Sequence, residues 1–550
     1  MTAPRRSLGW RDHAFGLALG VAYVAVLLRT VRGLGYARDE GFYVRAAESY
    51  ARWFELLARD RHAAMQRSAV DAAWAVNHEH PALLKSLFAL SWLAHKKLHL
   101  FVDEGTSFRF GGMIFGGLTL WLLYAWGTQA RSRAAGLAAA LAYATMPRVF
   151  YHAHLDCFDA PMAAMWALTA YAYWRSRSGG LGWALATGVV FGLALDTKHN
   201  AWFLPPALVL HALLARGGGL RRDLQVGRVR VPLSLVAMAT VGPAVFFALW
   251  PWLWFDTGAR LVGWAQFHLN HEYYNMVFLG VTYWKPPFPR AYAPFMTLAT
   301  VPTVTLVLFA VGALGWAFAR VRAWRAGPAR GPRDLGHTEL LWAIGLFVQY
   351  APWLSSSTPI FGGTKHWMGA YPFLCLFAGL GFERALAAIE SVVSARVPRP
   401  LVGGLVGASV LAAPLAETAH AHPWGLSSYT PLVGGAPGAA SLGLNRQFWG
   451  FTTGAVAGWL NDHVPRSGGQ VYVHDTAWDS WDVLRRDGRL APWVQPAVSP
   501  APSTFALYHH EPHMEGVEYQ IWVAYGTASP AYVGSYDGVP IVYVYEKPPR

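Results

Sequence analysis

The chain has 550 residues, of which 54% are hydrophobic and only 14% are charged, and its formal net charge is +14. Soluble domains carry about 25% charged residues and rarely expose large apolar patches, so this composition excludes an ordinary soluble protein. It indicates a polytopic membrane protein surrounded by the lipid bilayer. The basic residues form short clusters between apolar runs, without interleaved aromatic residues, so we expect no nucleic-acid partner.

Apolar stretches of about 17–22 residues recur along the chain, and each is long enough to cross a hydrocarbon core of about 30 Å. They predict about eleven transmembrane helices. The predicted spans are residues 14–32, 109–127, 134–150, 159–174, 181–196, 200–215, 232–254, 294–318, 338–354, 367–382 and 400–416. The first span follows Arg5 and Arg6 without a cleavage site, so we expect it to be retained.

Arginines in alternate loops predict the orientation, because positively charged short loops stay in the cytoplasm. These arginines are Arg131, Arg133, Arg175, Arg177, Arg216, Arg221, Arg222, Arg228, Arg230, Arg320, Arg322, Arg325, Arg330, Arg333, Arg384, Arg396 and Arg399. The N-terminus is then cytoplasmic, and loops 33–108 and 255–293 are periplasmic or otherwise extracytoplasmic. We therefore expect the chemistry on the outer face.

The tail, residues 417–550, has a different pattern. The runs "GQVYVHD", "TFALYHH", "YQIWVAY" and "IVYVYEK" are rich in β-branched and aromatic residues and are separated by turn residues. The predicted fold is therefore an all-α polytopic membrane domain, residues 1–416, followed by a small extracytoplasmic α/β domain, residues 417–550.

Two carboxylates, Asp39 and Glu40, follow the first span in "GYARDEGFY". They fit two interpretations. Carboxylates are favoured in the first turn of any helix, and a carboxylate at the mouth of a membrane cavity can also act as a general base. A second acidic position is Asp159 in "FYHAHLDCFDAP", which is either a functional group at a span entrance or a helix cap.

Three lysines stand near the outer ends of predicted spans. Lys85 lies in "NHEHPALLKSLF", which we expect to form an amphipathic helix on the membrane surface. Lys198 interrupts two apolar runs in "LALDTKHNAWF", and Lys365 stands at a span entrance in "GGTKHWMGAYPF". Each could bind a lipid phosphate, although a snorkelling lysine or a polar hairpin explains the same patterns.

The long loop 255–293 mixes histidines with aromatic side chains, among them His268 and Tyr283. Such a mixture suits sugar stacking and equally an interfacial aromatic belt. A divalent metal is an open alternative, with Glu79, His268 and His271 as candidate ligands, although the sequence lacks an HExxH motif.

These pieces in this order resemble the GT-C superfamily of membrane glycosyltransferases. The nearest likeness is to bacterial relatives of the dolichyl-phosphate-mannose protein mannosyltransferases and of the lipid A aminoarabinose transferase. The stretches that carry it are "RDEGFYVRAAESY", "NHEHPALLKSLF", "MPRVFYHAHLDCFDAPMAAMWAL", "GLALDTKHNAWFLPP", "GGTKHWMGAYPFLCLFAGLG" and "HPWGLSSYTPLVGGAPGAASLGLNRQFWG". The likeness covers roughly residues 10–460.

The resemblance implies an enzyme that moves a hexose or pentose from a polyprenyl-phosphate carrier to an acceptor outside the cytoplasm, with inversion. It implies that Asp39 is the catalytic base, that Glu40 assists it and that Asp159 is the second acid. The remaining expected site residues are Lys85, Lys198, His199, Lys365 and His366 at the donor phosphate, and Tyr43, His80, His154, His268 and Tyr283 at the sugar or acceptor.

Other functions are weaker matches to the sequence. A secondary transporter places charges within broken spans and often shows inverted repeats, whereas here the charges gather on one face. A non-catalytic scaffold would not need acids and lysines at several span mouths. The acceptor class stays open between a protein, a lipid and a cell-envelope glycan. The abundance of Arg and Ala suggests a bacterial inner membrane protein.

Overall fold

The structure is a computed structural model that describes residues 7–178, 180–215, 223–226, 229–325, 337–360, 362–394 and 396–549. Several arginines predicted on the cytoplasmic side lie outside the described residues: Arg5, Arg6, Arg216, Arg221, Arg222, Arg228, Arg330 and Arg333.

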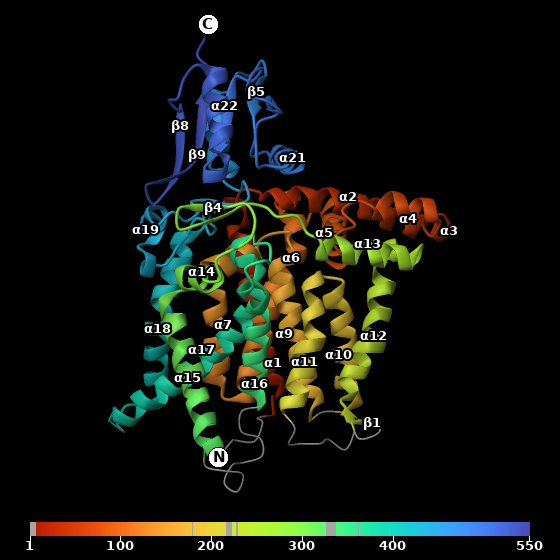
Figure 1. The fold of residues 1–550 in the computed structure, drawn as a ribbon, viewed down its shortest axis with the longest axis vertical. Coiled ribbons are helices and arrows are strands. Elements are labelled where there is room, and N and C mark those ends of the chain that lie inside the picture. The colour runs from red at the N-terminus through yellow and green to blue at the C-terminus, as the bar shows by residue number, and fades with distance from the viewer. Residues whose placement is uncertain are drawn as a thin grey trace.

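Helices form the larger part of the chain (Figure 1). The helices that coincide with predicted spans are α1 (Trp10–Thr30), α6 (Glu104–Ala130), α7 (Arg133–Ala144), α9 (Asp159–Ser176), α10 (Leu181–Leu195), α11 (Leu204–Leu214), α12 (Leu233–Leu249), α15 (Thr303–Arg325), α16 (His337–Tyr350), α17 (Tyr371–Val392) and α18 (Arg399–Ala421). Among the described residues, five helical stretches are long and apolar enough to cross a membrane, and they contain α1, α6, α15, α17 and α18. The total of eleven spans stays a prediction.

Prolines divide two of the predicted spans. The stretch 294–318 is split between α14 (Tyr292–Thr300) and α15, and Val301, which precedes Pro302, has an extended backbone. The stretch 134–150 is split between α7 and α8 (Pro147–Ala153), where Met146 is extended before Pro147. The ring of a proline disfavours helical geometry at the residue before it, so each helix ends there.

The bundle has a buried centre and a lipid-facing rim. Within their most apolar windows, 78% of α6 and 61% of α17 are buried, whereas only 17% of α15 and of α18 are. The helices approach closely where glycines meet: a Cβ atom on Gly20 of α1 would lie 2.6 Å from the carbonyl oxygen of Gly117 in α6. Small residues of this kind let membrane helices pack backbone to backbone.

Helices that lie across one end of the bundle cover its upper face (Figure 1). They are α2 (Arg38–Arg59), α3 (Arg61–Ala64), α4 (Arg67–Trp74), α5 (Leu83–Leu98) and α13 (Thr257–Leu269). Two short antiparallel hairpins complete the membrane part, β1 (Leu224–Val226) with β2 (Val229–Val231), and β3 (Met276–Phe278) with β4 (Val281–Tyr283).

The tail forms a five-stranded mixed sheet with the order β6-β5-β7-β9-β8. Its strands are β5 (Gly469–Tyr472), β6 (Val494–Ala497), β7 (Phe505–His509), β8 (Tyr532–Tyr536) and β9 (Val539–Glu546), and its helices are α19 (Gly435–Ser441), α20 (Thr453–His463), α21 (Trp478–Arg486) and α22 (Glu515–Tyr525). β5 runs parallel to β6 and β7, and the other neighbours are antiparallel. All five residues of β7 are buried, as expected for a central strand.

This tail packs directly on α2 and on the start of α6. The Arg489 guanidinium donates to the Leu34 carbonyl at 2.6 Å, and the Tyr36 hydroxyl donates to Asp487 at 2.5 Å. Arg486 forms two ion pairs at 2.8 Å, one with Glu48 in α2 and one with Glu104 at the start of α6. These contacts fix the position of the tail over the bundle.

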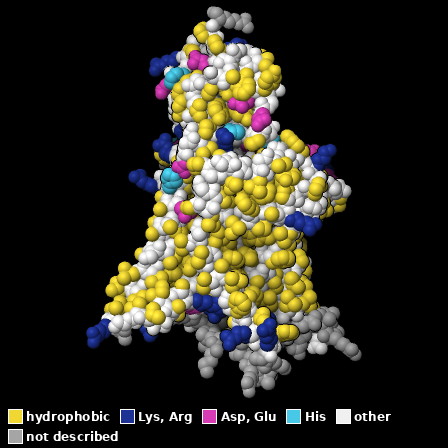
Figure 2. All heavy atoms as spheres, turned by 60° about the vertical axis from the view of Figure 1, so that its left-hand side comes forward, with side chains coloured by type: hydrophobic (Ala, Val, Ile, Leu, Met, Phe, Trp, Pro, Cys, Tyr) yellow, Lys and Arg dark blue, Asp and Glu magenta, His cyan; other side chains and the backbone are white. Residues whose placement is uncertain are grey.

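The surface agrees with a membrane-embedded helical part. In Figure 2, hydrophobic side chains cover much of the visible face of this part, and Lys and Arg side chains lie along its lower edge. Acidic and His side chains on the same face lie mainly in the upper part. Such a distribution is typical of a membrane protein.

Candidate active site

A cavity of about 760 Å³ lies where the upper end of the bundle, α2 and the C-terminal domain meet. Its walls come from α2, α8, α9, α13 and α14, from the loops after α10 and α16, and from residues 426–449. The C-terminal domain adds four further residues, Asp475, Glu511, His513 and Met514. The volume falls within the range that is usual for small-molecule sites, about 300–1,000 Å³.

The first turn of α2 presents Asp39 to this cavity. The neighbouring Glu40 turns away, accepts a hydrogen bond from the Ala37 N–H at 2.7 Å and pairs with the Arg109 guanidinium at 2.7 and 2.9 Å. The Asp39 carboxylate lies 3.5 Å from the Lys365 ammonium and 3.7 Å from the Arg38 guanidinium. Its side chain keeps 21% of its surface exposed, so a ligand in the cavity can reach it.

A second ion pair lies on another wall. Asp159 is the first residue of α9, and its carboxylate accepts a hydrogen bond from the Lys198 ammonium at 2.6 Å. The side chain of Asp159 is only 5% exposed. Its negative charge is therefore largely committed to Lys198, which makes it a poorer candidate for a base than Asp39.

Lys365 contacts both Asp39 and an aromatic side chain that lines the cavity. It lies in the short helix η5 (Gly363–His366), and its ammonium is 3.8 Å from the centre of the Trp449 ring. Burial lowers the pKa of Lys365, while the nearby Asp39 and Asp159 carboxylates oppose this change. The aromatic face and the carboxylates together favour a cation at this position.

Five histidines of the cavity have a pKa below its usual value because they are buried. Burial lowers the pKa of His152 and of His268 to about 4, and it lowers the pKa of His80, His199 and His366 as well. The rings of His199 and His268 stack with their centres 3.9 Å apart. These histidines therefore contribute hydrogen bonds and flat surfaces, and the charge in the cavity comes from Lys, Arg, Asp and Glu.

Aromatic rings surround the first turns of α2. The rings of Tyr43 and Phe158 are 4.2 Å apart, and the His80 ring lies 5.6 Å from Tyr43 and 5.1 Å from Phe158. All three residues line the cavity. Their flat faces offer the kind of surface on which the apolar face of a sugar ring can pack.

The C-terminal domain contributes charged groups that the sequence analysis missed. Asp475 accepts a hydrogen bond from the Arg38 guanidinium at 2.7 Å, and Glu511 accepts one from the Gln447 amide at 2.7 Å. Burial raises the pKa of both carboxyl groups, and for Glu511 the neighbouring Asp475 charge raises it further. No sequence signal links Asp475 to Arg38, because 437 residues separate them.

Arg148 and His152 were also missed as cavity residues, although both lie within a stretch that carries the family resemblance. They stand on α8 and line the cavity. The signal that could have identified them is the helical spacing of four residues, which places both side chains on the same face of the helix.

Nine of the thirteen residues predicted for catalysis or for binding line the cavity: Asp39, Tyr43, His80, Asp159, Lys198, His199, His268, Lys365 and His366. Among the described lining residues, four predicted members are missing: Glu40, Lys85, His154 and Tyr283. We leave these four out of the proposed site. Their contacts explain why they lie elsewhere.

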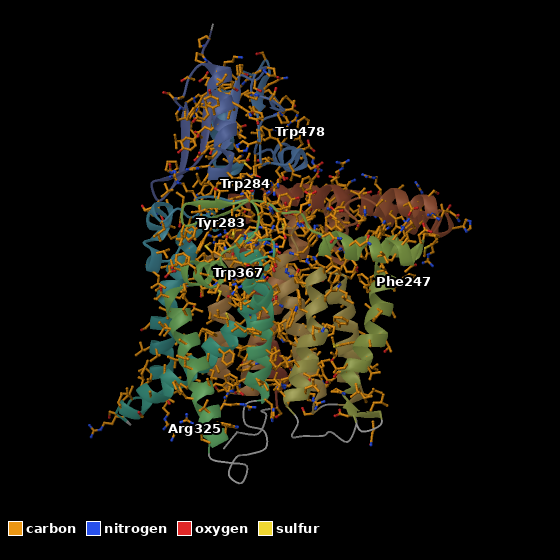
Figure 3. The ribbon with its side chains drawn as sticks, viewed as in Figure 1. Phe247, Tyr283, Trp284, Arg325, Trp367 and Trp478 are labelled. Atoms are coloured by element: carbon orange, nitrogen blue, oxygen red, sulfur yellow. The ribbon has the colours of Figure 1, made fainter. Side chains whose placement is uncertain are left out.

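Lys85 is fully buried, and its ammonium donates to the backbone carbonyls of Asn77 and His80 at 2.5 and 2.7 Å. Burial lowers its pKa to about 7. His154 contacts the Thr30 hydroxyl at 2.8 Å inside the bundle. Tyr283 lies on β4 in the layer between the bundle and the C-terminal domain, as Figure 3 shows.

The three candidate metal ligands do not form a ligand set. Glu79 accepts a hydrogen bond from the Asn77 amide at 2.5 Å, and one ring nitrogen of His268 contacts the backbone carbonyl of Glu79 at 2.9 Å. Within the part of the chain that the structure describes, no group of three or more His, Cys, Asp or Glu side chains is arranged to hold a metal ion.

Part of the chain matches a known family model. Residues 80–249 match the model of the dolichyl-phosphate-mannose-protein mannosyltransferases. The matched stretch contains the cavity residues His80, Arg148, Asp159, Lys198 and His199. No curated protein sequence matches the chain.

Solved structures resemble the whole chain in fold. ArnT from Cupriavidus metallidurans in the apo state is 15% identical, covers 96% of this chain and 97% of its own, and gives a TM-score of 0.50. The structure of the same protein bound to undecaprenyl phosphate is 14% identical, covers 96% of this chain and 97% of its own, and gives a TM-score of 0.47. The apo oligosaccharyltransferase from Archaeoglobus fulgidus is 11% identical, covers 96% of this chain and 75% of its own, and gives a TM-score of 0.48. The match to the apo ArnT structure shows a common fold, in agreement with the resemblance predicted from the sequence.

Proposed function

We propose, from the premise that this chain is a membrane protein with the GT-C glycosyltransferase fold, that it transfers a sugar from a polyprenyl-phosphate carrier to an acceptor. The transferred group is a hexose or a pentose, and the acceptor is a protein, a lipid or a cell-envelope glycan. The reaction takes place on the extracytoplasmic side of a bacterial plasma membrane. The observation that carries the proposal is the accessible Asp39 carboxylate beside Lys365 in the cavity.

Asp39 is the proposed general base. Among the carboxylates that form ion pairs in this cavity it is the most exposed, since Asp159 is 5% and Asp475 only 2% exposed. A base must come within hydrogen-bond distance of the proton that it removes. Asp39 takes the proton of the acceptor hydroxyl or amine as that atom attacks the anomeric carbon of the sugar.

Lys198 and Lys365 are the proposed binding groups for the carrier phosphate. As the acceptor attacks, the bond between the anomeric carbon and the phosphate oxygen breaks, and its electron pair stays on that oxygen. Two fixed ammonium groups stabilise the charge that develops there, in a cavity where electrostatic interactions are stronger than in water. Attack from the side opposite to the leaving phosphate inverts the anomeric centre.

The charged lining of the cavity favours an enzyme over a transporter or a scaffold. Asp39, Asp159, Lys198 and Lys365 come from four separate segments and line the same cavity. A scaffold has no need for such a convergence of costly buried charges. A transporter would require them on a path through the bundle, whereas they stand at the end that the C-terminal domain covers.

The test compares the wild type with Asp39→Asn. Purified protein in lipid nanodiscs is incubated with a panel of radiolabelled polyprenyl-phosphate sugars, with and without acceptor fractions of peptide, lipid and envelope glycan. We expect one donor to release its sugar, and we expect Asp39→Asn to lose about 10²–10⁴-fold in kcat, the usual contribution of a general base. NMR analysis of the product linkage then reports inversion.

The matched control is Glu55→Gln, which removes an exposed carboxylate from the same helix away from the cavity. We expect this variant to keep wild-type turnover. Equal turnover by Asp39→Asn and the wild type would remove Asp39 as the base. Absence of turnover with every donor and acceptor would contradict the transferase proposal as a whole.

A further inference from the structure

Four cationic side chains line the cavity within the described chain, and three of them face a carboxylate. The ion pairs are Arg38 with Asp475 at 2.7 Å, Lys198 with Asp159 at 2.6 Å and Lys365 with Asp39 at 3.5 Å. The fourth cation is Arg148. Among the described residues, none of its nitrogens lies within 4.0 Å of an Asp or Glu carboxylate oxygen.

Arg148 is almost completely withdrawn from solvent, with 6% of its surface exposed. One terminal nitrogen donates to the Ser428 carbonyl at 3.3 Å, and the guanidinium carbon lies 5.1 Å from the centre of the Tyr429 ring. Its Nε atom is buried without a hydrogen-bond partner among the described residues. The Tyr429 hydroxyl also forms a side-chain hydrogen bond with the guanidinium. A guanidinium has five N–H donors, so these contacts still leave donors unused, among them Nε–H.

Two other residues of the cavity also have buried polar atoms that lack a hydrogen-bond partner within the described chain. The Nδ1 atom of His152 and the Oδ1 atom of Asn445 are buried without a hydrogen-bond partner among the described residues, and both residues line the same cavity. A buried charge that lacks a counter-ion is strongly unfavourable, and buried polar groups normally find partners. An anion bound beside Arg148 would balance the guanidinium charge and accept a hydrogen bond from a protonated Nδ1 of His152, whereas the Asn445 oxygen is an acceptor and pairs with a donor, not with the anion.

We propose that Arg148 forms an anion subsite in the cavity and that this subsite holds a phosphate group of one of the two reactants. The guanidinium favours such a group because its planar N–H donors match phosphate oxygens in pairs. The phosphate comes either from the polyprenyl carrier or from a phosphorylated acceptor. The inference rests on the proposed function, since it names a substrate group for the same site.

The subsite is distinct from the two lysines assigned to the carrier. Lys198 and Lys365 each form an ion pair, with Asp159 and Asp39, whereas no carboxylate of the described residues lies within 4.0 Å of the Arg148 nitrogens. Arg148 also stands on a separate segment, α8, next to the loop that carries Ser428 and Tyr429. An acceptor that brings its own phosphate would therefore meet a cation without displacing an existing ion pair.

The experiment measures ligand binding by the full-length protein in nanodiscs, without any sugar transfer. Undecaprenyl phosphate probes the carrier, and glucose 1-phosphate probes a phosphate that has no polyprenyl chain. Binding to the wild type, Arg148→Gln and Arg148→Lys is read by intrinsic tryptophan fluorescence. We expect Arg148→Gln to weaken one probe by about tenfold or more, because a charge-assisted hydrogen bond is lost. Arg148→Lys keeps the charge but not the paired donors, so we expect its affinity for that probe to lie between those of the wild type and Arg148→Gln.

The control is Arg290→Gln, which removes an exposed arginine from the loop before α14 and should bind both probes as the wild type does. Loss confined to undecaprenyl phosphate assigns the subsite to the carrier, and loss confined to glucose 1-phosphate assigns it to the acceptor. The proposal is overturned if Arg148→Gln binds both probes with wild-type affinity, or if the wild type binds neither. If Arg148→Gln does not fold, Arg148→Lys carries the same comparison. Because no transfer is measured, failure of the proposed function would leave this result intact.

Discussion

Replacing Glu40 should destabilise the protein rather than remove a catalytic group. The Glu40 carboxylate is 0% exposed and makes two hydrogen bonds with Arg109, whose side chain is 1% exposed. Glu40→Gln leaves the Arg109 charge buried without its counter-ion, a change that costs about 3–5 kcal/mol in comparable buried pairs. It also weakens the hydrogen bond from the Ala37 N–H that starts α2, which is worth about 1 kcal/mol. We expect a clearly lower thermal midpoint.

The assay is thermal unfolding of the purified variants in the same detergent, followed by tryptophan fluorescence. The double variant Glu40→Leu with Arg109→Leu removes both charges and should recover much of the lost stability, since an apolar pair can replace a buried ion pair. Glu55→Gln on the exposed face of α2 should stay within about 0.5 kcal/mol of the wild type. A Glu40→Gln protein that melts like the wild type but has no turnover would refute this reasoning and return Glu40 to the catalytic site.

Three further predictions concern other buried features. Lys198→Met should lower stability by about 3–5 kcal/mol, because it leaves Asp159 buried without its partner at 2.6 Å, and adding Asp159→Leu should reverse the loss in a denaturant titration. Burial holds the pKa of His152 near 4, below its usual 6.5, so the unfolded chain takes up the proton first. Stability should therefore be complete above pH 6.5 and fall by about 3 kcal/mol as the pH drops to 4, and His152→Gln should flatten that part of a pH–stability curve. Gly117→Leu should cost about 1–3 kcal/mol, because its Cβ atom would lie 2.7 Å from a backbone oxygen of α1. Gly404→Leu is the control, since no heavy atom lies within 4 Å of that position, and equal melting of the two variants would contradict the packing argument.

The sequence was informative where polar residues interrupt apolar runs. Asp39, Asp159, Lys198 and Lys365 stand at the ends of predicted spans, where a charge is conspicuous and has few structural explanations. All four line the cavity. The same contrast in composition predicted where the membrane helices lie and where the tail begins to alternate between strands and helices.

The sequence was less informative about the direction in which a side chain points. Asp39 and Glu40 are neighbours, but successive helical residues point about 100° apart, so one faces the cavity and the other faces Arg109. The direction of Lys85 is a related case, because the loop before α5 folds back and supplies carbonyl oxygens to its ammonium. Neither outcome follows from residue type and spacing alone.

Sequence patterns could not predict the contacts between the tail and α2. Arg38 and Asp475 are 437 residues apart, and their pairing depends on how a complete domain docks on the bundle. The patterns describe each element by itself, whereas such a contact exists only after both elements have folded. The same limit applies to Glu511, which reaches the cavity from the loop after β7.

The wall that the C-terminal domain adds has a consequence for biosynthesis. The ribosome makes Asp39, Asp159, Lys198 and Lys365 long before it makes Asp475 and Glu511, yet all six residues line one chamber. A nascent chain that has inserted its helices still lacks this wall of the cavity and the shorter of the two ion pairs of Arg38, the one with Asp475. Completion of the cavity is thus coupled to the folding of a segment that is translated after the membrane helices, so the early helices alone do not form the whole site.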